Sequence, residues 1–238
     1  MELIDITRKL SENLHALTFG KPVATVYNPL EYAWKCHEAY LKKYGSGTKE
    51  TVFLGMNPGP WGMAQTGVPF GEISIVRDWL KINEPVRRPP EEHPAKPVTG
   101  LDCHRSEVSG RRLWGLFREI FGTPESFFRR FFVVNYCPLL FLEESGRNRT
   151  PVQLAASERR QLLAICDEAL RKSVAALGAK TVIGVGVFAE ERAREVLAQQ
   201  DVAVGRILHP SPASPAANRN WSGQVLDQLR DLGIRLEP

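Results

Sequence analysis

Four short, largely apolar runs of strand type alternate with segments of helical spacing along this chain of 238 residues. The runs lie at 51–54, 131–134, 181–187 and 202–208. Continuous apolar runs are typical of strands that are buried on both faces, and parallel strands need a crossover connection, usually a helix. We therefore expect one domain over residues 1–238, with a three-layer α/β/α structure around a central four-stranded, mainly parallel sheet.

The segments between the predicted strands repeat their apolar residues at helical spacing. The predicted helices lie at 3–17, 32–41, 73–82, 111–121, 151–177 and 188–199, with a closing helix that ends at 232. Two stretches are expected to be irregular. Residues 27–30 are predicted as a turn, and the Pro-rich, charged segment 84–100 is predicted as an exposed loop.

The first predicted strand leads directly into a loop of seventeen residues, 55–71, that is rich in Gly and Pro. Loops of this length inside compact domains are usually functional or disordered. Met56, Trp61 and Phe70 make this loop too apolar for disorder, which favours a ligand loop. The alternative is a purely structural role, because Asn-Pro-Gly-Pro at 57–60 is also good turn chemistry.

Polar side chains follow three of the predicted strands at the points where they end. Asn57 follows the first strand, Asn135 the second and His209 the fourth. A single His is more often a structural residue than a catalyst. Ligands of open α/β sheets bind outside the carboxyl ends of the strands, so we expect these three side chains to line one crevice.

Composition excludes several classes of protein. No run approaches the roughly 18 apolar residues that a membrane helix needs, and the N-terminal stretch lacks a signal-peptide core, so we expect a soluble intracellular protein without membrane contact. It would act in the cytoplasm or nucleoid of a bacterium, or in the nucleus of a eukaryote. The four cysteines form no Cys-x-x-Cys pair, which favours buried thiols over a metal site. A net charge of +4 with scattered Arg pairs is compatible with a polyanionic partner.

The loop motif and the fourth strand end together resemble one enzyme family. Gly-Met-Asn-Pro-Gly at 55–59 and His-Pro-Ser-Pro at 209–212 are similar to the paired motifs of the single-strand-selective monofunctional uracil-DNA glycosylase family, within the uracil-DNA glycosylase superfamily. Other branches resemble only one half of the pair. The likeness extends over most of the chain, and it implies DNA as the partner and removal of uracil, and of 5-substituted uracils such as 5-hydroxymethyluracil, as the reaction.

The resemblance also implies roles for individual residues. Phe70 would be the platform on which a flipped base stacks, and Asn135 would bind the pyrimidine edge. Met56 and Gly59 would form the pocket wall beside C5 of the base. For the chemistry, His209 would stabilise the negative charge on the departing base.

The second catalytic residue would be Asn57, which would orient the attacking water. Neither motif contains the lysine that a Schiff-base route would need, so we expect hydrolysis without a metal or an organic cofactor.

Contacts to the DNA strand are expected from the segment that follows His209. These residues are Ser211, Pro212, Ala213, Arg219 and Asn220. Some relatives have a bulky or basic residue at the position of Ala213, so the wedge that holds a duplex open falls here to Arg219, Asn220 or Trp221, unless Trp221 belongs to the core.

We expect a monomer that acts on single- and double-stranded DNA. Two alternatives are a non-catalytic lesion- or nucleotide-binding module of the same fold and a hydrolase of free nucleosides.

Overall fold

A four-stranded parallel sheet forms the centre of the protein, as a computed structural model that describes residues 2–237 shows. Its strands follow the order β3-β2-β6-β7. Their bounds are β2 Thr51–Gly55, β3 Phe131–Asn135, β6 Thr181–Val185 and β7 Ala203–Ile207. All three strand pairs are parallel, and Gly55 lies opposite Asn135 in the register. The predicted four-stranded parallel sheet is therefore confirmed.

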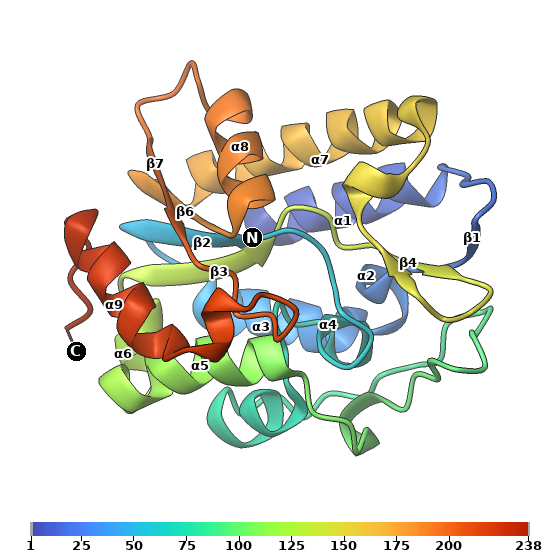
Figure 1. Ribbon diagram of the computed structural model, residues 1–238, viewed down its shortest axis with the longest axis horizontal. Helices are drawn as coiled ribbons and strands as arrows, with labels where there is room; N and C mark the ends of the chain where they lie inside the picture. Colours follow the sequence, from blue (N-terminus) through green and yellow to red (C-terminus); the bar gives the residue numbers. More distant parts are fainter. Residues whose placement is uncertain (1, 238) are drawn as a thin grey trace.

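Helices cover both faces of this sheet, with α1, α7 and α8 on one side and α3, α5 and α6 on the other (Figure 1). The α-helices are α1 Glu2–His15, α2 Pro29–Tyr32, α3 Trp34–Tyr44, α4 Met63–Thr66, α5 Val108–Phe121, α6 Pro124–Phe128, α7 Ala156–Ala176, α8 Val187–Val196 and α9 Trp221–Asp231. A π-helical turn spans Ile75–Trp79, and 3₁₀ turns span Gly100–Asp102, Pro151–Gln153 and Ala216–Asn218. This arrangement confirms the three-layer α/β/α prediction.

A second, antiparallel sheet was not predicted. It consists of β1 Val23–Tyr27, β4 Leu140–Glu143 and β5 Asn148–Arg149 in the order β1-β4-β5. Tyr27 thus ends a strand and does not begin the predicted turn. The short helix α2 follows it, with Asn28 as its N-cap. β1 is buried only at its two ends and β5 has two residues, so neither shows the continuous, buried apolar run that marks the central strands.

Two predicted element boundaries were wrong for local reasons. The predicted helix 151–177 begins only at Ala156, because Thr150 and Gln153 form a capping box around a separate 3₁₀ turn. The third strand ends at Val185 and not at 187, since Gly186 adopts a φ of +93° and starts α8.

An aromatic cluster fixes α5 and α6 against one face of the central sheet. Phe117 and Phe127 stack at 4.4 Å between ring centroids, and Phe53 of β2 lies 5.0 Å from Phe117. These rings and Trp114 are fully buried. Burial of a large apolar side chain contributes about 1.5–3 kcal/mol, so this cluster anchors the helix that lies beside the carboxyl ends of the strands.

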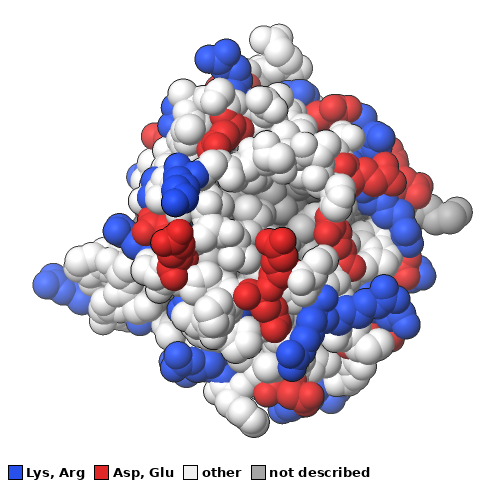
Figure 2. Space-filling view, turned by 90° about the vertical axis from the view of Figure 1, so that its right-hand side faces the viewer, with Lys and Arg blue, Asp and Glu red and all other residues white. Residues whose placement is uncertain are grey.

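Charges are mixed on the surface. Figure 2 shows Lys and Arg intermingled with Asp and Glu around an uncharged hollow on one face. Several of the Arg clusters are paired locally, as Arg130 is with Glu50 at 2.8 Å and Arg149 with Glu143 at 2.7 Å. Within residues 2–237, no helix is long and apolar enough to cross a membrane.

Candidate active site

A pocket of about 250 Å³ lies at the carboxyl ends of β2, β3 and β7. In Figure 1 the loop that leaves β2 and the loop that follows β7 approach each other there. The pocket contains all six residues that were predicted for base binding and catalysis, namely Met56, Asn57, Gly59, Phe70, Asn135 and His209. We refer to it below as the strand-end pocket. It confirms that the polar residues after three separate strands converge on one crevice.

Asn135 presents an amide oxygen that is buried and has no hydrogen-bond partner among residues 2–237. Its amide nitrogen lies 3.2 Å from Sδ of Met63, a weak acceptor. A buried polar atom without a partner costs about 1–3 kcal/mol, so native proteins seldom leave one unless a ligand or water completes it. The amide is therefore arranged to receive one donor and one acceptor from a bound molecule.

Phe70 is held in a left-handed backbone conformation, with a φ of +53°, that bulky residues rarely adopt. The carbonyl of Phe70 accepts a hydrogen bond from the Glu72 N–H at 2.8 Å. Its ring covers Gly55, where a Cβ would approach to 2.6 Å from Cε2 of Phe70 and would also strike Oδ1 of Asn135. The missing side chain of Gly55 thus leaves room for both the Phe70 ring and the Asn135 amide. Backbone strain such as that of Phe70 is typical of binding sites.

His209 lies beside Phe70, with ring centroids 6.3 Å apart. The backbone N–H of Ser211 donates a hydrogen bond to Nδ1 of His209 at 3.0 Å. Burial lowers the pKa of the imidazole from 6.5 to about 4. The ring is therefore neutral at pH 7, and because Nδ1 accepts a hydrogen bond, the proton is on Nε2.

Asn57 is oriented by the backbone that follows β3. Its Nδ2 donates a hydrogen bond to the carbonyl of Leu139 at 3.2 Å. This contact fixes which end of the amide is the donor, and it leaves Oδ1 of Asn57 free to accept from a ligand.

Besides Pro58 of the loop motif, five further residues that the sequence did not identify as site residues line the pocket. They are Met63, Glu107, Ser109, Asn148 and Thr150. The side-chain oxygen of Asn148 is buried and unpartnered within the described part of the chain, 2–237. Asn148 and Thr150 reach the pocket only because the unpredicted strand β5 places them there. Met63 belongs to the ligand loop, but its Met side chain resembled ordinary packing.

Glu107 is the only one of these five that ionises in the accessible pH range. Its carboxylate accepts the N–H of Gly110 at 2.9 Å and thereby caps α5. Burial raises its pKa from 4.5 to about 7, although this hydrogen bond opposes the shift. A Cβ built at Gly59 would lie 3.7 Å from this carboxylate, so Glu107 lies beside Gly59 in the pocket wall.

The loop after β7 is fastened to α5 and α9. The guanidinium of Arg112 donates hydrogen bonds to the carbonyl of Pro210 at 2.9 Å and to Oδ1 of Asn218 at 3.0 Å. Nε1 of Trp221 donates to the carbonyl of Leu208 at 2.8 Å. These contacts on both sides of His209 hold the imidazole in place.

Comparisons with known proteins identify the family. A model described as the uracil DNA glycosylase superfamily matches residues 42–231. A Bos taurus protein named single-strand selective monofunctional uracil DNA glycosylase is 55% identical over 228 residues, covering 95% of this chain and 84% of that protein. The Mus musculus protein of the same name is 54% identical, with 95% and 82% covered.

The chain belongs to the single-strand selective monofunctional uracil DNA glycosylase family.

The fold agrees with this result. A structure titled as the crystal structure of wild-type Pedobacter heparinus SMUG2 has a TM-score of 0.67 to this chain at 18% identity, and the match covers 96% of this chain and 98% of that one. In residues 2–237 no group of three or more His, Cys, Asp and Glu side chains is placed to hold a metal ion.

The predicted DNA-contacting residues of this family member lie on the rim beyond His209. Ser211 lines the pocket, whereas Pro212, Ala213 and Arg219 are exposed. Asn220 is also exposed, but its side chain accepts the N–H of Gly223 and caps α9. Trp221 is buried at 4% exposure, so it belongs to the core and does not reach the DNA side.

Proposed function

We propose that the strand-end pocket receives a uracil flipped out of DNA and that His209 and Asn57 promote hydrolysis of its N-glycosidic bond, leaving an abasic site. As a member of its family the chain is a monofunctional uracil DNA glycosylase, which removes uracil in base excision repair. The assignment of roles to residues is the proposal, and the unpartnered amide oxygen of Asn135 is the observation that supports it most directly.

Asn135 distinguishes uracil from cytosine by its hydrogen-bonding pattern. The free Oδ1 accepts the N3–H of uracil, and Nδ2 exchanges its weak contact with Met63 for the O4 carbonyl. Cytosine offers an acceptor at N3 and a donor at N4, so both groups of the amide would be mismatched. A site built on such contacts rejects the wrong base strongly because its own buried polar atoms stay unpaired.

Phe70 offsets the cost of flipping. Extruding a nucleotide costs a few kcal/mol, and stacking of a base on an aromatic ring returns roughly 1–3 kcal/mol. The fixed left-handed backbone of Phe70 presents the ring before DNA binds, so no further ordering of this side chain is needed.

His209 acts on the departing base as a neutral donor. Glycosidic cleavage places negative charge on uracil, and the Nε2–H of His209 is directed at O2, where this charge collects. A preorganised donor of this kind is typically worth about 3–4 kcal/mol. The Ser211 N–H holds the tautomer that makes the donation possible.

Asn57 positions the water that attacks C1′ of the sugar. Its Oδ1 accepts a hydrogen bond from the water, because its Nδ2 is engaged by the Leu139 carbonyl. An amide cannot take a proton as a carboxylate can, so Asn57 contributes orientation of the nucleophile. Positive charge on the sugar is then relieved as the water adds to C1′ and loses a proton to solvent or to the departing uracil anion.

Gly59 leaves room beside C5 of the base. Gly59 itself contributes no side chain to this wall, and the neighbouring Glu107 carboxyl is a group that a polar C5 substituent could meet. We infer that 5-hydroxymethyluracil is accepted together with uracil, and that the protein acts as a monomer on single- and double-stranded DNA.

The direct test is incubation with a uracil-containing single-stranded oligonucleotide, followed by alkali to cleave abasic sites. The proposal expects cleavage at the uracil only after alkali, with free uracil released and no reaction of deoxyuridine. Strand binding without base release would favour a non-catalytic module, and release from free deoxyuridine would favour a nucleoside hydrolase.

A further inference from the structure

A second hollow adjoins the strand-end pocket. It is open, has a volume of about 610 Å³ and is lined by residues that include Trp61, Arg88, Asp102 and Arg105. Trp61 follows Gly59 by two residues and Arg105 precedes Glu107 by two, and both Gly59 and Glu107 line the strand-end pocket. The segments 59–61 and 105–107 therefore each contribute residues to both hollows.

Trp61 is accompanied by two cations, of which Arg105 lines the hollow and Lys96 lies between the lining residues Ala95 and Pro97. The ammonium of Lys96 lies 5.0 Å from the centroid of the indole, and the guanidinium of Arg105 lies 4.9 Å from it. Trp61 and Lys96 are partly exposed and Arg105 is exposed. A solvent-accessible aromatic ring flanked by cations is the combination with which proteins bind single-stranded nucleic acid.

Gln65 links the two segments of this hollow that carry Trp61 and Lys96. Its side chain is fully buried, and Nε2 donates hydrogen bonds to the carbonyls of Pro60 at 2.9 Å and Pro97 at 3.0 Å. Pro60 immediately precedes Trp61, and Pro97 immediately follows Lys96. One buried amide thus sets the position of the indole relative to the ammonium.

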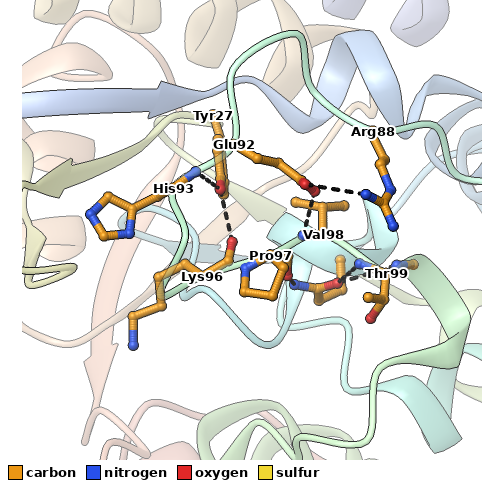
Figure 3. Close-up of polar contacts among 10 residues, drawn as sticks. Tyr27, Arg88, Glu92, His93, Lys96, Pro97, Val98 and Thr99 are labelled. Carbon is orange, nitrogen blue, oxygen red and sulfur yellow. Dashed lines mark hydrogen bonds and ion pairs between the residues drawn. The ribbon is translucent and has the colours of Figure 1, made fainter.

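The segment that contains Lys96 is ordered by a further network, shown in Figure 3. Oη of Tyr27 accepts the N–H of His93 and donates to the carbonyl of Lys96, each at 2.8 Å. The carboxylate of Glu92 accepts the N–H of Val98 at 2.8 Å. In Figure 3 the ammonium of Lys96 points away from these contacts. The exposed Pro-rich segment is therefore preorganised, and the ammonium of Lys96 is free of this network.

We propose that Trp61, Lys96 and Arg105 form a subsite for an unpaired nucleotide of the DNA strand next to the flipped uracil. The neighbouring base stacks on the indole, while the two cations move from the ring to the flanking phosphates. Arg88 and Arg105 outnumber Asp102 along the hollow, which suits a polyanion. This inference rests on the proposed function, since it places the same strand across both hollows.

The test measures binding of a uracil-free single-stranded oligonucleotide and of the matching duplex by fluorescence anisotropy, at one salt concentration. Trp61→Ala should weaken single-strand binding by about fivefold or more, and Trp61→Phe should retain most of it because it keeps a stacking face. Duplex binding should fall by less than about twofold, because paired bases cannot stack on a side chain.

Arg105→Ala tests the cation and has a matched control in the same chain. Arg8 lies 4.4 Å above the ring of Trp34 in a separate hollow, so Arg8→Ala removes an equivalent contact elsewhere. Arg105→Ala should make the salt dependence of single-strand binding shallower by about 0.7 in log–log slope, whereas Arg8→Ala should leave it unchanged.

The proposal is overturned if Trp61→Ala binds the single strand within about twofold of wild type, if it weakens single strand and duplex equally, or if Arg105→Ala and Arg8→Ala behave alike. These comparisons use DNA without uracil, so they stand apart from the glycosylase assignment. That assignment fails instead if the wild-type protein releases no uracil from a strand that it binds.

Discussion

The backbone N–H of Ser211 donates a hydrogen bond to Nδ1 of His209 at 3.0 Å. Protonation of Nδ1 would bring its N–H against the N–H of Ser211, and the hydrogen bond would be lost. The loop geometry therefore holds His209 as the neutral Nε2–H tautomer, and burial lowers its pKa in the same direction. The pH dependence of catalysis follows from this one relationship.

Protonation of His209 should cause almost no change in the rate of uracil excision between pH 7 and pH 5. An imidazole with the ordinary pKa of 6.5 would be about 97% protonated at pH 5, whereas a pKa of about 4 keeps it mostly neutral until the pH nears 4. Single-turnover rates across this range, compared between wild type and Glu107→Gln, would check this. A fall of tenfold or more centred near pH 6.5 in both proteins would contradict it.

Two replacements of Asn57 should distinguish its role in orienting the water from the additional effect of a group that accepts a proton. Asn57→Ala should lower the excision rate at least about a hundredfold, because the attacking water loses its acceptor. Asn57→Asp should remain at least about tenfold faster than Asn57→Ala, since a carboxylate orients the same water and can take its proton.

The Asp variant will still fall short of wild type, since its second oxygen would face the Leu139 carbonyl in place of the Nδ2 donor. An Asp variant that folds normally but is as slow as the Ala variant would count against a water-placing role.

Glu107 should impose a measurable pH dependence on stability. A carboxyl whose folded pKa is raised stays protonated in the native state while the unfolded chain ionises. Its contribution is therefore fully present below pH 4.5 and is lost as the pH rises to about 7. The free energy of unfolding of wild type relative to Glu107→Gln should fall by up to roughly 3 kcal/mol across this window.

Urea unfolding at several pH values would measure this difference. His37 and His209, whose pKa values are lowered to about 4 by burial, act in the opposite direction between pH 4 and 6.5, but they are common to both proteins and cancel. A difference that stays constant from pH 4.5 to 7 would show that folding does not raise the pKa of Glu107.

The strand-end pocket could be predicted from the sequence because its polar residues lie at the ends of recognisable strands. Gly55 and Asn135 are opposite each other in the parallel register, so two apolar runs that were recognisable alone were sufficient to bring Asn57 and Asn135 together. His209 follows from the same rule applied to β7. Each of these residues lies at the end of a central strand or within two residues of it.

The remaining site residues depend on contacts that no local pattern encodes. Asn148 belongs to a strand of two residues, which has no periodicity to detect. Glu107 lies just before the predicted helix 111–121, and only the tertiary structure reveals that its carboxyl caps α5 and lies beside Gly59 in the pocket. The segment 84–100 was correctly predicted to be irregular, but its order comes from Tyr27 and Gln65, which are distant in sequence.

Strand preference should reflect the small side chain of Ala213. Little fills the gap that an extruded base would leave in a duplex, so single-stranded uracil DNA should be cleaved at least as fast as a U:A pair, and U:G faster than U:A because the wobble pair opens more readily. Arg219 is exposed on the same rim. Arg219→Ala should therefore slow U:A more than single-stranded DNA.

Single-turnover rates at matched salt would measure these differences, with Arg230→Ala as the control. Arg230 is an exposed residue of α9 paired with Asp227, so its loss should affect none of the three substrates. A uniform loss on all three with Arg219→Ala would make Arg219 a phosphate contact and not a wedge.

The account depends above all on His209 as the donor that stabilises the departing base, and the most direct measurement is the single-turnover excision rate of His209→Ala on uracil-containing single-stranded DNA, with the affinity for the same strand measured in parallel. We predict a rate at least about a hundredfold below wild type with affinity nearly unchanged, because the lost interaction strengthens only as charge develops on the base. A folded variant whose rate stays within about tenfold of wild type would contradict the mechanism.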